Sequence, residues 1–239
     1  MTTGYLYVLH GRRGKIPESN LELLAGFIAD EGQLGRISFL EGDEQTLEDG
    51  ITDLQSQPGV DHLVIVPVLL YSATHMRWDI PERSAKVLDP AIKVTVTEPL
   101  AETEAVERHL ERTLGAAVQA FPNRRVLLIA HGTPHFPEPF EQLQALAARV
   151  GKAIGVEIVP TNHVGHPKIE ETLVDEHGPF IVERLFLTDG RLAAKMKARV
   201  QAIESGDVFL PTLEDDPVII NAIRERLVQR TQAAIELPH

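Results

Sequence analysis

The chain has 239 residues, 43% of them hydrophobic, which is enough for one large domain or two compact ones with a substantial core. It contains no cysteine, which excludes disulfides and zinc fingers and leaves His, Asp, Glu and backbone oxygen as metal ligands. A formal net charge of −12 argues against a nucleic-acid partner, because such binding needs a basic surface. The sequence shows no secretory signal and no membrane-spanning run, so we expect a cytoplasmic protein without a membrane partner.

The first half alternates apolar runs, which predict buried strands, with stretches whose apolar residues have helical spacing. Strands are predicted at residues 5–9, 36–40, 62–71 and 92–97. Helices are predicted at 19–28, with Ser19 as its cap, and at 46–54, 80–88 and 103–120. This alternation predicts right-handed crossovers and a mostly parallel sheet.

The same pattern begins again at residue 125, where R-V-L-L-I-A-H-G repeats the strand, His and Gly of residues 5–11. Further strands are predicted at 156–159, 180–187 and 208–210, and helices at 141–150, 169–174, 193–203 and 217–234. We therefore predict an α/β protein of two similar lobes, 1–121 and 122–239, each a mostly parallel sheet flanked by helices.

A cluster of cations follows the first predicted strand, in the segment L-H-G-R-R-G-K. Its members are Arg12, Arg13 and Lys15. On an acidic chain, such local positive charge suits a small anionic ligand better than a polymer. A loop that serves only solubility is the other interpretation.

Three candidate metal ligands lie at or near the carboxyl ends of the first three predicted strands, where open α/β sheets bind ligands. His10 ends the first strand, Glu41 ends the second, and His75 lies just past the third. Two imidazoles and a carboxylate suit a divalent first-row metal, and so few ligands would leave the site open. Taken singly, each residue also fits an ordinary structural or surface role.

The second half keeps only part of this set. His131 stands where His10 stands, but Leu192 falls near the place of His75. An active first lobe and a supporting second lobe are therefore expected. His163 and His166, in N-H-V-G-H-P, are either ligands at close spacing or residues that line the cleft facing the first lobe.

The sequence resembles the sirohydrochlorin chelatases, class II chelatases that insert iron or cobalt into a modified tetrapyrrole. The matching segments are Y-L-Y-V-L-H-G-R-R (5–13), I-S-F-L-E-G-D-E-Q-T (37–46) and V-I-V-P-V-L-L-Y-S-A-T-H-M-R-W-D-I-P (64–81). The second half resembles the degenerate C-terminal lobe of the long, two-lobe members. There are departures: the family commonly has Gly-His-Gly-Ser-Arg, whereas here Leu9 precedes the His and Arg12 replaces the Ser, and Gln45 stands where Pro is common.

The resemblance implies insertion of Fe²⁺ into sirohydrochlorin for sirohaem biosynthesis, in an active cleft between the lobes. It implies that His10, His75 and Glu41 are the catalytic and metal-binding residues. Arg12, Arg13, Lys15 and Arg77 would then pair with the carboxylates of the substrate. No cofactor is expected beyond the divalent metal substrate, and a chain that carries both lobes is expected to be a monomer.

Three alternatives stay open. A cobaltochelatase, or a nickel-inserting relative, would use the same ligands, since these ions all accept imidazole and carboxylate. A metal or tetrapyrrole carrier without catalytic activity would use the same pocket. A histidine phosphatase is a weaker alternative, because in that class an Arg directly precedes the His, where this chain has Leu9.

Overall fold

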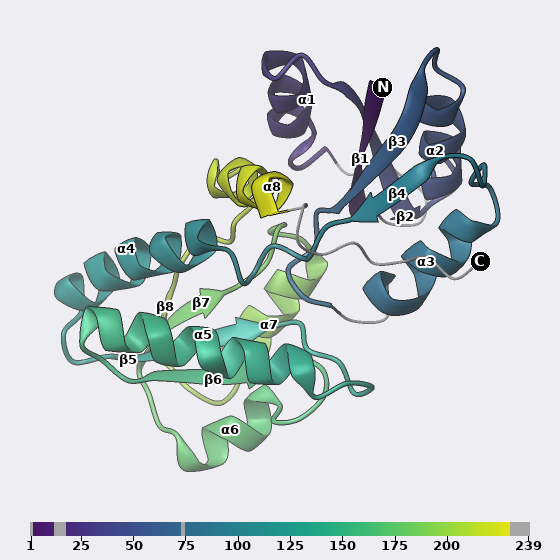
Figure 1. The fold of residues 1–239 in the computed structure, drawn as a ribbon. Coiled ribbons are helices and arrows are strands. Elements are labelled where there is room, and N and C mark those ends of the chain that lie inside the picture. The colour runs from purple at the N-terminus through teal and green to yellow at the C-terminus, as the bar shows by residue number, and fades with distance from the viewer. Residues whose placement is uncertain (1, 12–17, 73–74, 230–239) are drawn as a thin grey trace. The chain divides into compact units, whose positions relative to one another are not determined.

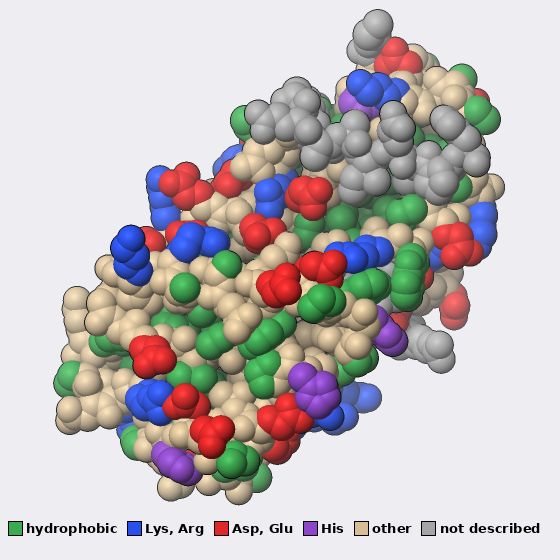
Figure 2. All heavy atoms as spheres, turned by 60° about the horizontal axis from the view of Figure 1, so that its bottom comes forward, with side chains coloured by type: hydrophobic (Ala, Val, Ile, Leu, Met, Phe, Trp, Pro, Cys, Tyr) green, Lys and Arg blue, Asp and Glu red, His purple; other side chains and the backbone are tan. Residues whose placement is uncertain are grey.

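The computed structural model describes residues 2–11, 18–72 and 75–229, and for His75 only the backbone. The chain divides into two compact units, Met1–Thr103 with Ile219–His239, and Glu104–Val218. Among the described helices, none is long and apolar enough to cross a membrane. On the face shown in Figure 2, Lys and Arg side chains lie interspersed with Asp and Glu.

The first unit contains a four-stranded parallel sheet with the order β2-β1-β3-β4. Its strands are β1 (Thr2–Gly11), β2 (Leu34–Glu41), β3 (Val60–Pro67) and β4 (Lys93–Val96). Its helices are α1 (Leu21–Asp30), α2 (Leu47–Gln55), α3 (Ile80–Ala85) and α8 (Val218–Gln229), with a π-helical turn at His75–Asp79. Figure 1 shows α1 and α2 on opposite faces of this sheet.

Alternation along β1 divides the first core into two layers. Leu6 and Val8 face α2 and α3, where they join a buried cluster that includes Ile51 and Ile80. Tyr7 points to the opposite face and packs edge-on against Phe27 of α1, with ring centroids 5.9 Å apart. Burying both faces explains why the predicted strands appear as unbroken apolar runs.

The second unit repeats this arrangement as a parallel sheet with the order β6-β5-β7-β8. Its strands are β5 (Arg125–Ala130), β6 (Ile158–Asn162), β7 (Phe180–Arg184) and β8 (Val208–Phe209). Its helices are α4 (Glu104–Ala120), α5 (Glu138–Ile154), α6 (Ile169–Asp175) and α7 (Arg191–Gln201). The shared strand order confirms the predicted α/β fold of two similar lobes.

Two helices, α4 and α8, depart from the predicted split between residues 121 and 122. We expected α4 in the first lobe and α8 in the second, but each belongs to the other unit. In the second unit, α4 packs along α5 and contacts β7. In the first, α8 returns to α1, where Arg224 pairs with Glu31 at 3.0 Å, and Arg226 donates to the carbonyl of Pro99 at 2.7 Å. The expected active cleft between the lobes stays a prediction.

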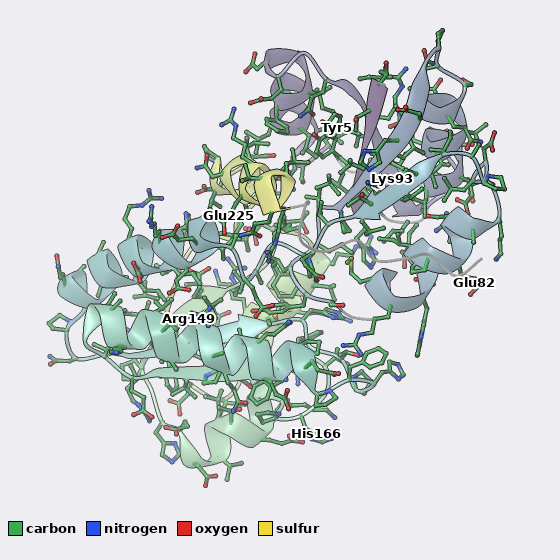
Figure 3. All side chains as sticks on the ribbon, in the orientation of Figure 1. Tyr5, Glu82, Lys93, Arg149, His166 and Glu225 are labelled. Atoms are coloured by element: carbon green, nitrogen blue, oxygen red, sulfur yellow. The ribbon has the colours of Figure 1, made fainter. Side chains whose placement is uncertain are left out.

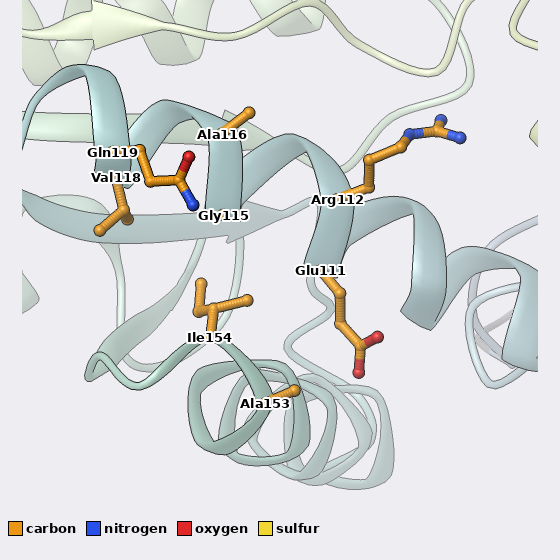
Figure 4. A pocket seen from close by; sticks show the side chains of 8 residues that line it. All are labelled: Glu111, Arg112, Gly115, Ala116, Val118, Gln119, Ala153 and Ile154. Atoms are coloured by element: carbon orange, nitrogen blue, oxygen red, sulfur yellow. The ribbon is translucent and has the colours of Figure 1, made fainter.

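The groove between α4 and α5 is lined partly by small residues, among them Gly115, Ala116 and Ala153 (Figure 4). Further along the same helix pair, Nε of Arg149, which is labelled in Figure 3, lies 2.7 Å from a carboxylate oxygen of Glu107. The groove lies where α4 leads into β5 and α5 leads into β6, at the amino ends of the strands. It is therefore at the end of the sheet opposite to the edge where α/β folds bind ligands.

Three expected element ends differ from the structure. The first helix begins at Leu21, after Asn20 in the left-handed region (φ 67°), so Ser19 is not its N-cap; Asn tolerates this conformation better than most residues. The third strand ends at Pro67, although the apolar run continues, because proline has no N–H to extend the ladder. The residues after it do not form a plain loop, since a π-helical turn begins at His75.

A glycine follows the strand-end histidine in both units and allows the chain to turn close against its neighbour. Gly11 has φ +75°, and a Cβ there would lie 2.4 Å from the carbonyl oxygen of Glu41. Gly132 has φ +72°, and its Cβ would lie 2.1 Å from the carbonyl oxygen of Val164. Any larger residue would need both a strained backbone and a displaced neighbour.

Glu183 is a carboxyl group in the second core, on β7, with 2% of its surface exposed. Its Oε1 makes no hydrogen bond to the described residues. Burial raises the pKa of Glu183 to about 8, although the neighbouring charge of Arg184 opposes this. At neutral pH, therefore, the protonated form of this side chain predominates.

We expect Gly132→Ala to lower the free energy of unfolding by about 3 kcal/mol or more, because strain and collision add. Gly155→Ala is the matched control: its φ is +74°, but nothing lies within 4 Å of the added Cβ. It should cost about 1 kcal/mol, the backbone term alone. Urea denaturation of both variants measures the difference, and equal losses would contradict the proposed collision.

We expect the free energy of unfolding to fall as pH rises from about 4.5 towards 8 because of Glu183. In this range the native state keeps the proton, with a pKa of about 8, while the unfolded state, with an ordinary value near 4.5, releases it. Glu183→Gln should remove this part of the pH dependence, whereas the exposed Glu157→Gln should retain it. Urea denaturation across the range tests this, and parallel curves for wild type and Glu183→Gln would refute it.

Candidate functional site

Two of the predicted site residues lie on adjacent strand ends in the first unit. His10 is the penultimate residue of β1, and Glu41 is the last residue of β2. The strands are parallel neighbours, and Gly11 is in register with Glu41. The structure therefore brings the backbones of His10 and Glu41 to the same carboxyl edge of the sheet.

The imidazole of His10 is exposed, and its Nδ1 lies 3.1 Å from the carbonyl oxygen of Gly11. A carbonyl oxygen only accepts, so this contact requires the proton on Nδ1. Nε2 of the neutral imidazole is then unprotonated, and its lone pair can bind a metal ion. His131 in the second unit has the same contact, with Nδ1 2.9 Å from the oxygen of Gly132.

The loop after Glu41 is held at both ends. The amide of Phe39 donates to the carbonyl of Gln45 at 2.8 Å. Thr46 then caps α2 in a reciprocal capping box with Asp49. Glu41 therefore stands at the start of a short loop fixed to the sheet and to a helix.

The segment that carries His75 follows β3, the other neighbour of β1. The amide of Val68 still donates to the carbonyl of Val8 at 2.8 Å, so the chain continues beside β1 after the strand ends. The π-helical turn His75–Asp79 then leads directly into α3. Single π turns are rare and are frequently found at functional sites.

The other predicted binding residues are only partly described. Arg77 lies in the π-helical turn and is exposed, and its neighbour Trp78 is 52% exposed and so is not a core residue. Arg12, Arg13 and Lys15 lie outside the described residues.

The second unit lacks the carboxylate at the corresponding place. The turn after His131 approaches the carbonyl of Val164, as the turn after His10 approaches that of Glu41. The carboxylate position is therefore occupied by an apolar residue. Among the side chains that the structure describes, no cluster of three or more His, Asp or Glu could hold a metal ion.

Two further histidines that the sequence singled out, His163 and His166, are engaged in local contacts in the second unit. His163 accepts a hydrogen bond at Nδ1 from Arg199 at 2.7 Å, and burial, followed by the charge of Arg199, lowers its pKa. His166, labelled in Figure 3 near α6, has Nδ1 2.9 Å from a carboxylate oxygen of Glu171. These contacts favour a structural role for both.

One ion pair near the site is not predicted from the sequence. Arg83 of α3 pairs with Glu48 of α2, and this hydrogen-bonded contact lowers the pKa of Glu48 and raises that of Arg83. The internal repeat offers a signal for this pair. Glu170 is the second residue of α6, as Glu48 is of α2, and Arg199 lies on α7, the next helix of its unit.

Comparisons with known proteins agree with this architecture. The CbiX family model matches residues 4–117. A sirohydrochlorin cobaltochelatase of Saccharolobus solfataricus is 32% identical over 113 residues, covering 43% of this chain and 86% of that protein. A sirohydrochlorin ferrochelatase of Bacillus subtilis is 28% identical over 252 residues, covering 99% of this chain and 94% of that protein.

Two solved structures share the fold over nearly the whole chain. SirB from Bacillus subtilis with Fe³⁺ has a TM-score of 0.81 at 22% identity, covering 99% of this chain and all of that one. CbiX, described as the terminal enzyme for siroheme biosynthesis in denitrifying bacteria, has a TM-score of 0.71 at 18% identity, covering 94% and 98%. The fold is thus that of the two-lobed chelatases. The chain belongs to the sirohydrochlorin chelatase family and spans nearly the whole length of the Bacillus subtilis member.

Proposed function

We propose that this protein inserts Fe²⁺ into sirohydrochlorin, as a sirohydrochlorin ferrochelatase of sirohaem biosynthesis. The observation that carries the proposal is the placement of His10 and Glu41 on adjacent strand ends of the first unit. The Bacillus subtilis ferrochelatase, aligned over 99% of this chain, supports iron as the metal.

His10, Glu41 and His75 are the residues that we assign to the metal ion. Nε2 of His10 can bind the metal because Nδ1 faces the carbonyl of Gly11. Two imidazoles and one carboxylate leave coordination positions open. An open site suits delivery, because a closed four-ligand shell would hold the ion instead of passing it to the ring.

Insertion replaces two pyrrole N–H protons by one M²⁺, so two protons leave for each metal ion that enters. A neutral imidazole can accept a proton near neutral pH, and a carboxylate can orient it or take the proton in turn. We assign these tasks jointly to the same three residues, which are therefore both catalytic and metal-binding.

The cation cluster that follows β1 suits an anionic substrate. Sirohydrochlorin carries many carboxylates, and guanidinium groups bind carboxylates in a bidentate way. We assign Arg12, Arg13, Lys15 and the exposed Arg77 to these contacts. The exposed Trp78 can offer an apolar surface to the macrocycle.

We further propose that only one of the two units is catalytic. The first unit, which bears His10 and Glu41, performs the insertion, and the second unit is a degenerate repeat in which Val164 stands at the place of Glu41. We propose a cytoplasmic monomer, since one chain already supplies both lobes.

Cobalt insertion is the second candidate. The observation that favours it is the 32% identity to the Saccharolobus solfataricus cobaltochelatase. Parallel anaerobic assays with Fe²⁺ and Co²⁺, each against a protein-free control, decide between them by the ratio of catalysed rates. Binding of the tetrapyrrole without faster insertion of either metal would identify a carrier instead.

We expect His10→Ala, Glu41→Gln and His75→Ala each to reduce insertion at least about 100-fold, because each removes a metal ligand or proton acceptor. His131→Ala is the matched control and should retain most activity. Anaerobic absorbance measures the metallated product. If His131→Ala were the most damaging change, the active lobe would be wrongly assigned.

We expect Arg12→Gln, Arg13→Gln and Arg77→Gln to raise the KM for sirohydrochlorin several-fold, with a smaller change in kcat, because they weaken charge pairing with bound substrate. Added salt should raise the wild-type KM and affect these variants less. Arg112→Gln, on α4, is the control and should leave KM unchanged. A uniform loss of kcat at constant KM would argue against substrate pairing.

A further inference from the structure

Arg83 ties three segments of the first unit together. Its Nε donates to Oε1 of Glu48 at 2.6 Å, and its Nη2 bonds the other carboxylate oxygen of Glu48. Its Nη1 donates to the carbonyl oxygen of Leu40 at 2.6 Å. A single guanidinium thus connects α3, the first turn of α2 and the end of β2. We refer to Arg83, Glu48 and the carbonyl of Leu40 as the first clamp.

The first clamp joins the two segments that carry Glu41 and His75. Leu40 directly precedes Glu41, and α3 directly follows the π-helical turn that begins at His75. The side chains of Arg83 and Glu48 are only 24% and 31% exposed, so their bidentate pair is less screened than a surface pair. Because the planar guanidinium makes three oriented hydrogen bonds, it fixes the relative orientation of the bonded segments as well as their separation.

The second unit contains the same arrangement. Nε of Arg199 donates to Oε1 of Glu170 at 2.5 Å, Nη2 bonds the second oxygen, and Nη1 donates to the carbonyl oxygen of His163 at 2.7 Å. Glu170 is the second residue of α6, as Glu48 is of α2. His163 directly precedes Val164, as Leu40 precedes Glu41. This second clamp therefore repeats the first, but holds a strand end that has no carboxylate.

We propose that Arg83 is a positioning residue of the metal site, which holds the strand end bearing Glu41 and the turn bearing His75 at a fixed separation. This inference rests on the proposed function, because it assumes that both residues serve one metal ion. Arg83 acts through the Leu40 carbonyl and through α3, in the way that supporting hydrogen bonds orient metal ligands.

The second clamp provides a control for a merely structural role. The side chains of Arg199 and Glu170 are 26% and 49% exposed, so the buried fraction of each arginine is nearly equal in the two clamps. Arg83→Gln and Arg199→Gln each remove the three hydrogen bonds of a clamp, and Arg199→Gln also removes the bond to Nδ1 of His163. Arg199→Gln should therefore cost at least as much free energy of unfolding as Arg83→Gln. Only Arg83→Gln should disturb metal handling.

The test measures Co²⁺ binding to the full chain by titration of visible absorbance, beside insertion kinetics with Fe²⁺ and sirohydrochlorin. We expect Arg83→Gln to weaken Co²⁺ binding about 10-fold or more and to lower kcat, with little change in the KM for sirohydrochlorin. Arg199→Gln should leave both near the wild-type values. Arg83→Lys keeps the positive charge but loses the planar guanidinium that binds both oxygens of Glu48, so its Co²⁺ affinity should be intermediate.

Equal effects of Arg83→Gln and Arg199→Gln on Co²⁺ affinity, or no effect of either, would overturn the inference. If Arg83→Gln fails to fold, Arg83→Lys provides the test. An unchanged Co²⁺ affinity in Arg83→Lys would show that the bidentate guanidinium is not needed and would overturn the inference. The proposed function fails separately: a wild-type protein that binds Co²⁺ but does not accelerate insertion would refute catalysis while the binding data still test Arg83.

Discussion

The register between β1 and β2 is the constraint on which the proposed chemistry depends. Gly11 can pass within contact distance of the Glu41 carbonyl only because it lacks a side chain and adopts a positive φ. That approach sets the strand ends level, so that His10 and Glu41 lie at one edge of the sheet. The long apolar runs, buried on both faces, fix the same register from within the core, since a slip of one residue would turn every side chain to the other face.

Comparison of the two units separates the features that both share from those found in only one. Strand order, the positive-φ glycine and the arginine clamp are present in both. The carboxylate is not, since Val164 replaces Glu41. Features kept in both units support the shared architecture, and in the first unit the clamp also holds the strand end that bears Glu41. A feature found in only one is a better candidate for catalysis.

Much of this was predictable from sequence because the signals are local. Continuous apolar runs located the strands, and a polar residue at the end of such a run placed His10 and Glu41 at the ligand edge. The rest depends on contacts distant along the chain. No local pattern distinguishes a π-helical turn from a loop at His75, and nothing in the order of the helices shows that α8 packs on α1. Arg83 and Glu48 are 35 residues apart, and their pairing becomes visible only once the fold is known.

The return of α8 to the first unit also bears on how the protein is made. In chain order, the second unit is an insertion within the first. The guanidinium of Arg224 lies over the ring of Phe27, and this contact closes a loop of nearly the whole chain. On the ribosome, the second unit can therefore complete its own contacts first, while the lobe assigned to catalysis waits for the last helix to emerge. Synthesis must pass residue 229 before the first unit is whole, so activity can appear only after α8 has been made.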